Sequence, residues 1–314
     1  MKKKYNGRLW VQIAFAALTN GYWRGFWEGK IYTGPGKQFC LPGLNCYSCP
    51  GALGACPIGA LQAVMGSGQY TISFYVLGFL MVVGALCGRL VCGFLCPFGL
   101  VQDLLHKIPL PRGWKLRRIP GERRLSLLRY GVLLVFVLLL PNLVVNAAGQ
   151  GDPWFCKWIC PSGTLMGGIP LVSADAATQQ TVGPLSWSVS LRDAIGGLFA
   201  WKVTLMALLL LWSVCYYRPF CRFLCPLGAL YGLANPVSLY RYRIDEEKCT
   251  GCGLCARVCK LGIDPRKTPN SPQCIRCGEC VRRCPEQAIL PAKLFQRRRG
   301  GCAGCTGACR REKA

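Results

Sequence analysis

The cysteines of this chain are the residues whose type and spacing can do chemistry. The chain has 314 residues, with 23 cysteines and a single histidine, His106. Cysteines in C-x2-C-x2-C-x3-C runs indicate metal clusters rather than disulfides. One histidine excludes a haem held by two histidines and a Rieske centre, and the sequence has no CxxCH segment for attaching haem c. We therefore expect redox chemistry on thiolate-bound clusters, with a quinone or a flavin as further candidate cofactors.

Two cysteine runs lie near the C-terminal end. Residues 249–259 read CTGCGLCARVC, and residues 274–285 read CIRCGECVRRCP. This spacing is typical of two-cluster bacterial ferredoxins, in which the fourth cysteine of each run binds the other cluster. Structural zinc also uses four cysteines, but two interlocked runs favour two [4Fe–4S] clusters. The predicted ligands are Cys249, Cys252, Cys255 and Cys284 for the first cluster, and Cys259, Cys274, Cys277 and Cys280 for the second.

A second motif, C-x3-C-P, occurs three times before these two runs, at Cys92/Cys96, Cys156/Cys160 and Cys221/Cys225. A spacing of four residues predicts that both thiols lie on one helix face, with the proline ending that turn. Two thiols cannot complete the four ligands of a cubane cluster, so two motifs must combine. The predicted inner cluster uses Cys92, Cys96, Cys221 and Cys225, and Cys87 and Cys215 are substitute ligands.

Further cysteines precede the second apolar stretch and end the chain. The predicted outer cluster uses Cys40, Cys46, Cys49 and Cys56, and Cys156 and Cys160 are other candidates for its fourth ligand. Disulfides are the alternative for this set, since an extracytoplasmic compartment permits them. Cys302, Cys305 and Cys309 have no adjacent fourth ligand. Their role stays open between metal binding and a tail with reactive thiols.

Four apolar stretches are long enough to position these motifs in a bilayer, which needs about 20 apolar residues as helix. The predicted spans are residues 9–27, 70–86, 130–145 and 194–215. Basic residues precede the first span and fill the segment between the second and third, so the positive-inside rule predicts a multi-pass inner-membrane protein with both termini in the cytoplasm. The formal charge of +25 is high, but the basic residues flank apolar spans, and we expect no nucleic-acid partner.

The chain repeats its own order of elements. Each half, residues 8–110 and 125–235, reads span, cysteine loop, span, cysteine loop. We expect an all-α polytopic bundle of four spans with a pseudo-twofold repeat over residues 1–239. A small α+β domain at residues 240–292, here called the ferredoxin module, is predicted to follow. Residues 293–314 form a basic, cysteine-containing tail.

The segments CGRLVCGFLCPFG at 87–99 and CRFLCPLGA at 221–229, with the module after them, resemble membrane polyferredoxins of the NapH and NosR type. The resemblance covers roughly residues 70–290. It implies an electron-transfer subunit of a redox complex in a bacterial or archaeal membrane, linking a cytoplasmic donor or the quinone pool to an extracytoplasmic acceptor. The sequence shows no nucleophile–base pair or phosphate loop, so no substrate chemistry of its own is expected. The alternative is a redox sensor or a maturation factor for metal centres that uses the same clusters.

Overall fold

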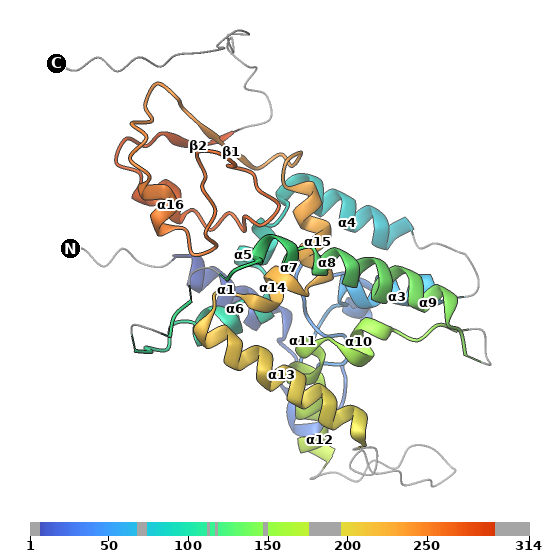
Figure 1. Cartoon of the computed structure of the whole chain (residues 1–314). Coiled ribbons are helices and arrows are strands. Elements are labelled where there is room, and N and C mark those ends of the chain that lie inside the picture. The colour runs from blue at the N-terminus through green and yellow to red at the C-terminus, as the bar shows by residue number, and fades with distance from the viewer. Residues whose placement is uncertain are drawn as a thin grey trace, which may run out of the picture.

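The computed structural model describes residues 7–67, 74–111, 114–116, 119–146, 150–175 and 196–292. A body of helices carries the ferredoxin module at one end (Figure 1). The first half of the body contains α1 (Gly7–Thr19), α2 (Arg24–Glu28), η1 (Pro35–Gln38), α3 (Pro57–Gly66), α4 (Phe74–Cys87), α5 (Leu90–Phe94) and α6 (Pro97–Leu105). The second half contains α7 (Glu122–Leu125), α8 (Leu128–Val132), η2 (Leu133–Leu139), α9 (Leu140–Leu143), α10 (Trp154–Trp158), α11 (Pro161–Gly163), η3 (Thr164–Gly168), α12 (Ile169–Asp175), α13 (Gly197–Cys215), α14 (Pro219–Phe223) and α15 (Pro226–Ala234). The predicted helix-rich fold with a ferredoxin module is confirmed.

Helix lengths differ from the four predicted spans. Within the described residues, α13 is the one helix long and apolar enough to cross a bilayer. The helix at 128–143 and α4 are apolar but shorter, and residues 70–73 of the second predicted span lie outside the described residues. At 1.5 Å per residue, the 14 residues of α4 reach about 21 Å, against roughly 30 Å of hydrocarbon.

The predicted first span is wrong as a single helix. Helix α1 ends at Thr19, where the Thr19 hydroxyl donates to Phe15 O at 2.8 Å and the Asn20 amide donates to Ala16 O at 2.9 Å. These side-chain bonds compete with the helix ladder at its end. Leu53 N donates to Thr19 O at 3.0 Å, and this bond joins the C-terminal end of helix α1 to the cysteine loop of residues 40–56.

The ferredoxin module closes with a pair of strands. β1 (Arg241–Ile244) pairs antiparallel with β2 (Ile289–Ala292), with Arg241 opposite Ala292. Between them α16 (Leu254–Val258) packs against α17 (Glu279–Arg283). Gly253 and Gly278 precede these two helices with φ of 72° and 74°. Only glycine adopts that conformation without a steric cost, so the chain can turn tightly around the cysteines.

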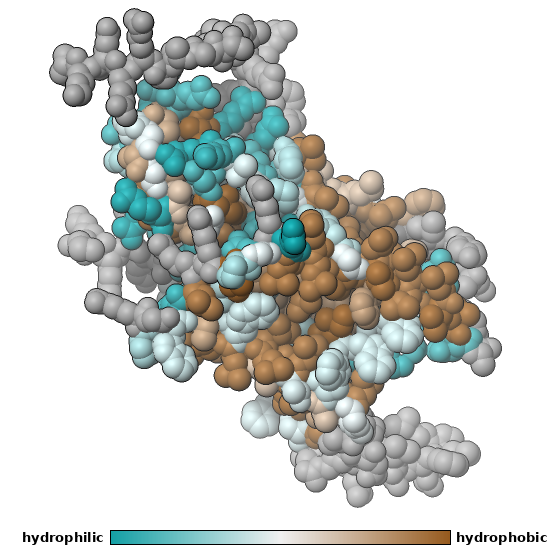
Figure 2. Space-filling model, viewed as in Figure 1, coloured by the Kyte–Doolittle hydropathy of each residue, from teal (hydrophilic) through white to brown (hydrophobic). Residues whose placement is uncertain are grey.

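The two parts have different surfaces. Figure 2 shows hydrophobic residues gathered over the helical body and hydrophilic residues over the module. Phe74, Met81, Leu143 and Leu211 of α4, α9 and α13 expose between 66% and 78% of their surface. An apolar surface spread over several helices marks a face that contacts something other than water.

Candidate iron–sulfur sites

The eight thiols of the ferredoxin module line two cavities. One small cavity is lined by all four members of the first predicted set, together with Gly251 and Gly253. Another is lined by all four members of the second set, together with Tyr242 and Ile275. The fourth cysteine of each run therefore crosses to the other cavity, as the ferredoxin spacing requires.

The four inner thiols, Cys92, Cys96, Cys221 and Cys225, are brought together from the two halves, and each is no more than 6% exposed. The predicted placement of each pair on one helix face is wrong. Cys92 lies in α5 and Cys221 in α14, whereas Cys96 and Cys225 cap the next helices, α6 and α15, in extended conformation. A residue before proline avoids the helical region, and proline at the first position starts a helix well. Each motif is therefore helix, break, helix.

Two buried arginines hold the inner thiols across the halves. Arg218 Nη1 donates to Cys92 O at 2.5 Å, and Arg89 Nη2 donates to Cys221 O at 2.8 Å. Each arginine precedes the first cysteine of its own motif by three residues and binds the carbonyl of the opposite motif. Gly99 and Gly228 leave the room, since a Cβ there would lie 3.2 and 3.0 Å from the Nη2 atoms of Arg218 and Arg89.

The buried charge around the inner thiols fits an anionic cofactor. Arg89 and Arg129 are each 1% exposed, and within the described part of the chain neither pairs with a carboxylate. Cys225 is among the electrostatic neighbours of Arg129. A buried cation is costly unless an anion compensates it. A cubane held by four thiolates carries about two negative charges, so the donor set and its surroundings fit this group.

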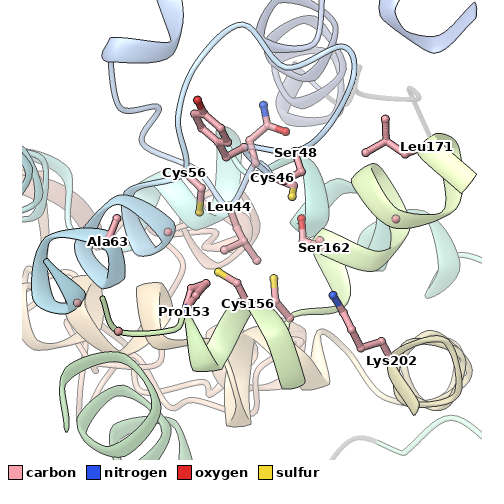
Figure 3. A pocket seen from close by; sticks show the side chains of 18 of the residues that line it. Leu44, Cys46, Ser48, Cys56, Ala63, Pro153, Cys156, Ser162, Leu171 and Lys202 are labelled. Atoms are coloured by element: carbon pink, nitrogen blue, oxygen red, sulfur yellow. The ribbon is translucent and has the colours of Figure 1, made fainter. Parts of the chain in front are cut away.

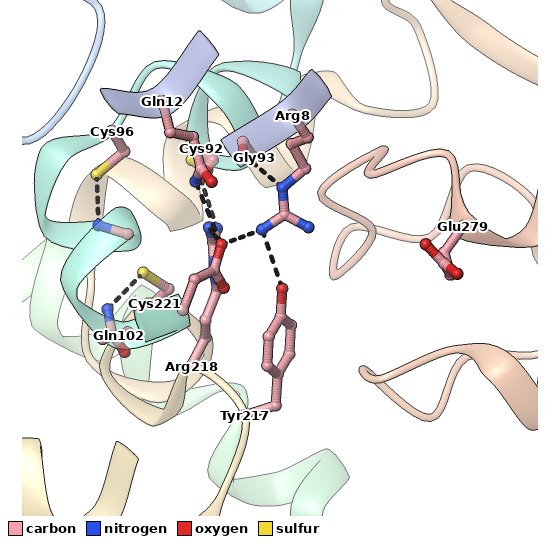
Figure 4. Close-up of polar contacts among 12 residues, drawn as sticks. Arg8, Gln12, Cys92, Gly93, Cys96, Gln102, Tyr217, Arg218, Cys221 and Glu279 are labelled. Carbon is pink, nitrogen blue, oxygen red and sulfur yellow. Dashed lines mark hydrogen bonds and ion pairs between the residues drawn. The ribbon is translucent and has the colours of Figure 1, made fainter. Parts of the chain in front are cut away.

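Arg218 itself is fixed by a carboxylate. Its Nε donates to Asp103 Oδ1 at 2.8 Å and its Nη2 to Asp103 Oδ2 at 2.6 Å (Figure 4). Arg8 also pairs with Asp103, and Gln12 donates to it at 3.2 Å. Burial raises the pKa of Asp103, but Arg218 and Arg8 outweigh burial and hold that pKa well below its usual range.

The ferredoxin module is docked directly on the inner thiols. A Cβ on Gly93 would lie 2.4 Å from Ile275 O, and these residues directly follow Cys92 and Cys274. Arg276 Nη1 donates to Cys87 O at 2.9 Å, and Asn235 Nδ2 donates to Cys274 O at 2.8 Å. The second thiol set of the module therefore lies beside the inner thiols. Cys87 and Cys215 are the last residues of α4 and α13.

The predicted outer cysteines separate into two groups. Cys46, Cys56, Cys156 and Cys160, here called the cavity thiols, line a cavity of about 630 Å³. In Figure 3 the sulfur atoms of Cys46, Cys56 and Cys156 and the amine of Lys202 point into the same space. Cys40 and Cys49 are buried but are not among its lining residues: Cys40 N binds the Tyr75 hydroxyl, and the Cys49 thiol donates to Asn20 Oδ1 at 3.6 Å. Cys156 and Cys160, which were predicted as alternative ligands, therefore share this cavity with Cys46 and Cys56.

Proximity shows also in the thiol pKa values. Burial, with the like charge of Cys221 next, raises the pKa of Cys96 to about 12. Burial, with the like charge of Cys156 next, raises the pKa of Cys56 to about 12. Metal binding displaces such thiol protons. No three His, Cys, Asp or Glu side chains of the described residues converge closely enough to hold a single metal ion.

Arg89, Arg218 and Gln102 were not predicted as site residues from the sequence. Gln102 is fully buried and its amide donates to Cys221 Sγ at 3.0 Å. The segment R-x2-C-x3-C-P occurs at both 89–97 and 218–226, and this repeat is the sequence feature that could have identified the two arginines. Cys302, Cys305 and Cys309 lie outside the described residues.

Comparison with known proteins covers both parts of the chain. Two models, each described as a 4Fe-4S binding domain, match it: one at residues 69–119, 131–172 and 198–241, and the other at 242–263 and 270–290. No solved structure matches the chain. The [4Fe–4S] clusters predicted from the cysteine spacing are therefore confirmed as its cofactor type.

Three relatives give the family. The putative electron transport protein YccM of Escherichia coli is 24% identical over 89% of this chain and 71% of its own length. The ferredoxin-type protein NapH of the same organism is 26% identical over 74% of this chain and 72% of its own length. The regulatory protein NosR of Pseudomonas aeruginosa is 27% identical over 66% of this chain, which spans only 25% of that protein. With 4Fe-4S binding domains along both its body and its module, this chain is a polyferredoxin similar to NapH and, over part of its length, to NosR.

Proposed function

We propose that this chain relays electrons within a membrane, between a cytoplasmic donor or quinone pool and an extracytoplasmic partner, as a subunit of a redox complex. The observation that carries the proposal is the direct contact between Gly93, beside an inner thiol, and Ile275, beside a module thiol. Bound at these thiols, [4Fe–4S] clusters take up and release single electrons. The ligands we propose are the two predicted sets of the module and the four inner thiols.

The exposure of the module cysteines indicates which of its two sites a soluble redox partner can reach. Cys252 of the first set is exposed, whereas Ile275 beside the second set is 1% exposed against the body. A soluble donor or acceptor protein would therefore meet the module at its first set. Arg222 and Arg276 fix the module by bonds to Leu261 O at 2.8 Å and Cys87 O at 2.9 Å. We expect a docked module rather than one that moves between partners.

Short paths also join the inner thiols to the cavity thiols. The backbone of Leu44 is an electrostatic neighbour of the Cys96 thiol, and Cys46 follows two residues later at the cavity. Two residues of extended chain reach about 7 Å. Tyr231, 1% exposed, has both Cys92 and Cys56 among its electrostatic neighbours. This spacing removes the need for a quinone or flavin between the two thiol groups.

A lipid bilayer is the environment that best accounts for the body. The apolar helix α13, the shorter apolar helices and their exposed large side chains support it. The basic segment at 107–129 supports the same side for the module and the N-terminus, which we assign to the cytoplasm. Four membrane passes, with α1, α4 and the helix at 128–143 shorter than a full bilayer, remain part of the proposal.

The experiment is electron transfer across a sealed membrane. Purified protein is placed in vesicles that contain ferricyanide, and an impermeant low-potential donor is added outside. We expect ferricyanide reduction that is lost in Cys92→Ser, while the module keeps its two EPR components. Equal reduction by Cys92→Ser and the unaltered protein would refute transfer through the inner thiols.

A redox sensor stays the second candidate because NosR, one relative, bears the name of a regulatory protein. A sensor needs cluster reduction but no passage of electrons. Clusters that reduce fully, with no reduction of the enclosed ferricyanide in the unaltered protein, would favour it over the relay.

A further inference from the structure

We propose that the cavity thiols, Cys46, Cys56, Cys156 and Cys160, bind one further [4Fe–4S] cluster in a site built on the same plan as the inner thiols. The proposal deepens the electron relay and rests on it. It replaces Cys40 and Cys49 of the predicted outer set by Cys156 and Cys160, and so draws its ligands from both halves of the body.

The first support is a repeated helix start. Residues 56–62 read CPIGALQ and residues 96–102 read CPFGLVQ. In each case the cysteine caps a helix, α3 or α6, that begins at the proline. The Gly99 N–H donates to Cys96 Sγ at 3.4 Å, and Gly59 holds the corresponding position three residues after Cys56 without forming that bond. Cys56 thus occupies in one site the position that Cys96 occupies in the other.

The glutamine of each segment makes the same contact across the halves. Gln62 Nε2 lies 3.2 Å from Cys156 Sγ, and Gln102 Nε2 lies 3.0 Å from Cys221 Sγ. Both glutamines are fully buried. Cys156 and Cys221 are each the first cysteine of a C-x3-C-P motif in the second half. A hydrogen bond from a buried amide to sulfur is stronger when the sulfur is an ionised thiolate, as it is in a cluster ligand.

The second cysteines of these two motifs correspond as well. Cys160 and Cys225 are both extended helix caps before proline. The electrostatic neighbours of Cys160 are Cys156, Cys46 and Cys56, so all four cavity thiols are mutual neighbours. The corresponding neighbours of Cys225 are Cys221, Cys92 and Cys96.

One position is filled differently. Four residues before Cys96 stands Cys92, but four residues before Cys56 stands Ala52, which is fully buried. Cys46 supplies the missing thiol from the loop. A Cβ on Gly167 would lie 3.4 Å from Cys46 Sγ, and a Cβ on Gly163 would lie 3.7 Å from it. These distances place the sulfur against the helix that follows Cys160.

The surroundings suit an anionic guest. Lys202 lines the cavity and is an electrostatic neighbour of Cys46 and Cys156. Asn45 also lines it, is 1% exposed, and neither polar atom of its amide has a hydrogen-bond partner among the described residues. All four cavity thiols are free of disulfides.

Loading is a ligand exchange without net oxidation. A [4Fe–4S]2+ cube on a donor complex exchanges its four donor thiolates for the four cysteine sulfurs. Four iron–sulfur bonds break and four form, and the four cysteine protons pass to the released donor thiolates.

The test compares two double variants of the full-length protein, purified anaerobically in detergent. Cys156→Ala/Cys160→Ala removes half of the proposed ligands, and Cys40→Ala/Cys49→Ala removes two buried cysteines of the same region. We expect about four fewer irons and sulfides per chain in the first variant only, with loss of one EPR component. Unchanged iron in the first variant, or disulfides between cavity thiols found by mass after alkylation without reduction, would overturn the proposal.

Two further measurements keep the outcome clear. Gln62→Met preserves volume and should shift one EPR component while Gln102→Met shifts a different one; if both shift the same component, the two sites are not separate. Cys92→Ser reports on the inner thiols. If Cys92→Ser loses about four irons while Cys156→Ala/Cys160→Ala loses none, the cavity cluster is refuted and the electron relay is not.

Discussion

Replacing Asp103 by asparagine removes the one carboxylate that Arg218 binds through two nitrogens, at 2.8 and 2.6 Å. Arg218 is fully buried, so the variant leaves an uncompensated cation inside the body. Breaking a buried pair in this way costs about 3–5 kcal/mol. The Coulomb energy of two charges about 4 Å apart is also about 4 kcal/mol at an effective dielectric constant of 20. The two figures agree, and we expect a loss of about 3–4 kcal/mol in the free energy of unfolding.

Thermal unfolding in detergent, followed by tryptophan fluorescence, measures this loss. At about 2 °C per kcal/mol for a chain of this size, Asp103→Asn should lower Tm by roughly 6–8 °C. The folded pKa of Asp103 lies below the unfolded value of about 3.9, so its stabilisation is complete above that value and is lost as pH falls through the folded pKa. The gap in Tm between the two proteins should therefore be full at pH 7 and narrow only under acid conditions.

The matched control is Asp264→Asn. Asp264 pairs with Arg266 at the surface, where the two side chains are 23% and 35% exposed. A surface pair contributes about 0–1 kcal/mol. Equal changes in Tm for the two variants, or a gap for Asp103→Asn that widens toward low pH, would contradict the reasoning.

Three other changes follow from the same geometry. Gly93→Ala places a Cβ 2.4 Å from Ile275 O and should undock the module, seen as faster proteolysis at residues 240–292; Gly78→Ala, where a Cβ meets nothing within 4 Å, should leave proteolysis unchanged. Arg129→Met removes a buried cation near Cys225 and should lower the reduction potential of one EPR component, with no shift in the exposed control Arg124→Met. A unit charge about 8 Å from a one-electron centre shifts its potential by roughly 90 mV at an effective dielectric constant of 20, which sets the scale of the effect. Labelling of right-side-out cells with an impermeant thiol reagent under conditions that unfold and demetallate the protein should modify Cys46 and Cys156 but not Cys252; protection of Cys46 would refute the proposed orientation.

Local spacing predicted the parts of the sites that depend on neighbouring residues. The grouping of the eight module thiols follows from their two runs, because the fourth cysteine is carried across by the short connection between them. The four inner thiols also lie together, although they come from the two halves. Their helix geometry was predicted wrongly because the proline effect on the preceding cysteine outweighs the four-residue helical spacing.

The spacing of residues in the sequence could not predict the contacts between distant segments. Cys46 joins Cys156 and Cys160 through a folded loop whose path depends on bonds such as Leu53 N to Thr19 O, 34 positions apart. The helix within the first predicted span ends at Thr19, the residue that the same loop contacts. Neither contact has a periodic signal in the sequence, because the first joins the two halves and the second joins segments 34 positions apart.

The crossing of thiols between halves has a consequence for biogenesis. The inner thiols need Cys221 and Cys225 beside Cys92 and Cys96, and the cavity thiols need Cys156 and Cys160 beside Cys46 and Cys56. A nascent chain that has emerged only as far as α6 therefore holds half of each cage and can complete neither. With the ligands proposed above, the cavity site can be completed only after Cys160 has been made and the inner site only after Cys225, whereas the module gathers its eight thiols within 36 residues, from Cys249 to Cys284. In the proposed sites, iron therefore enters the body only after the two halves have folded together.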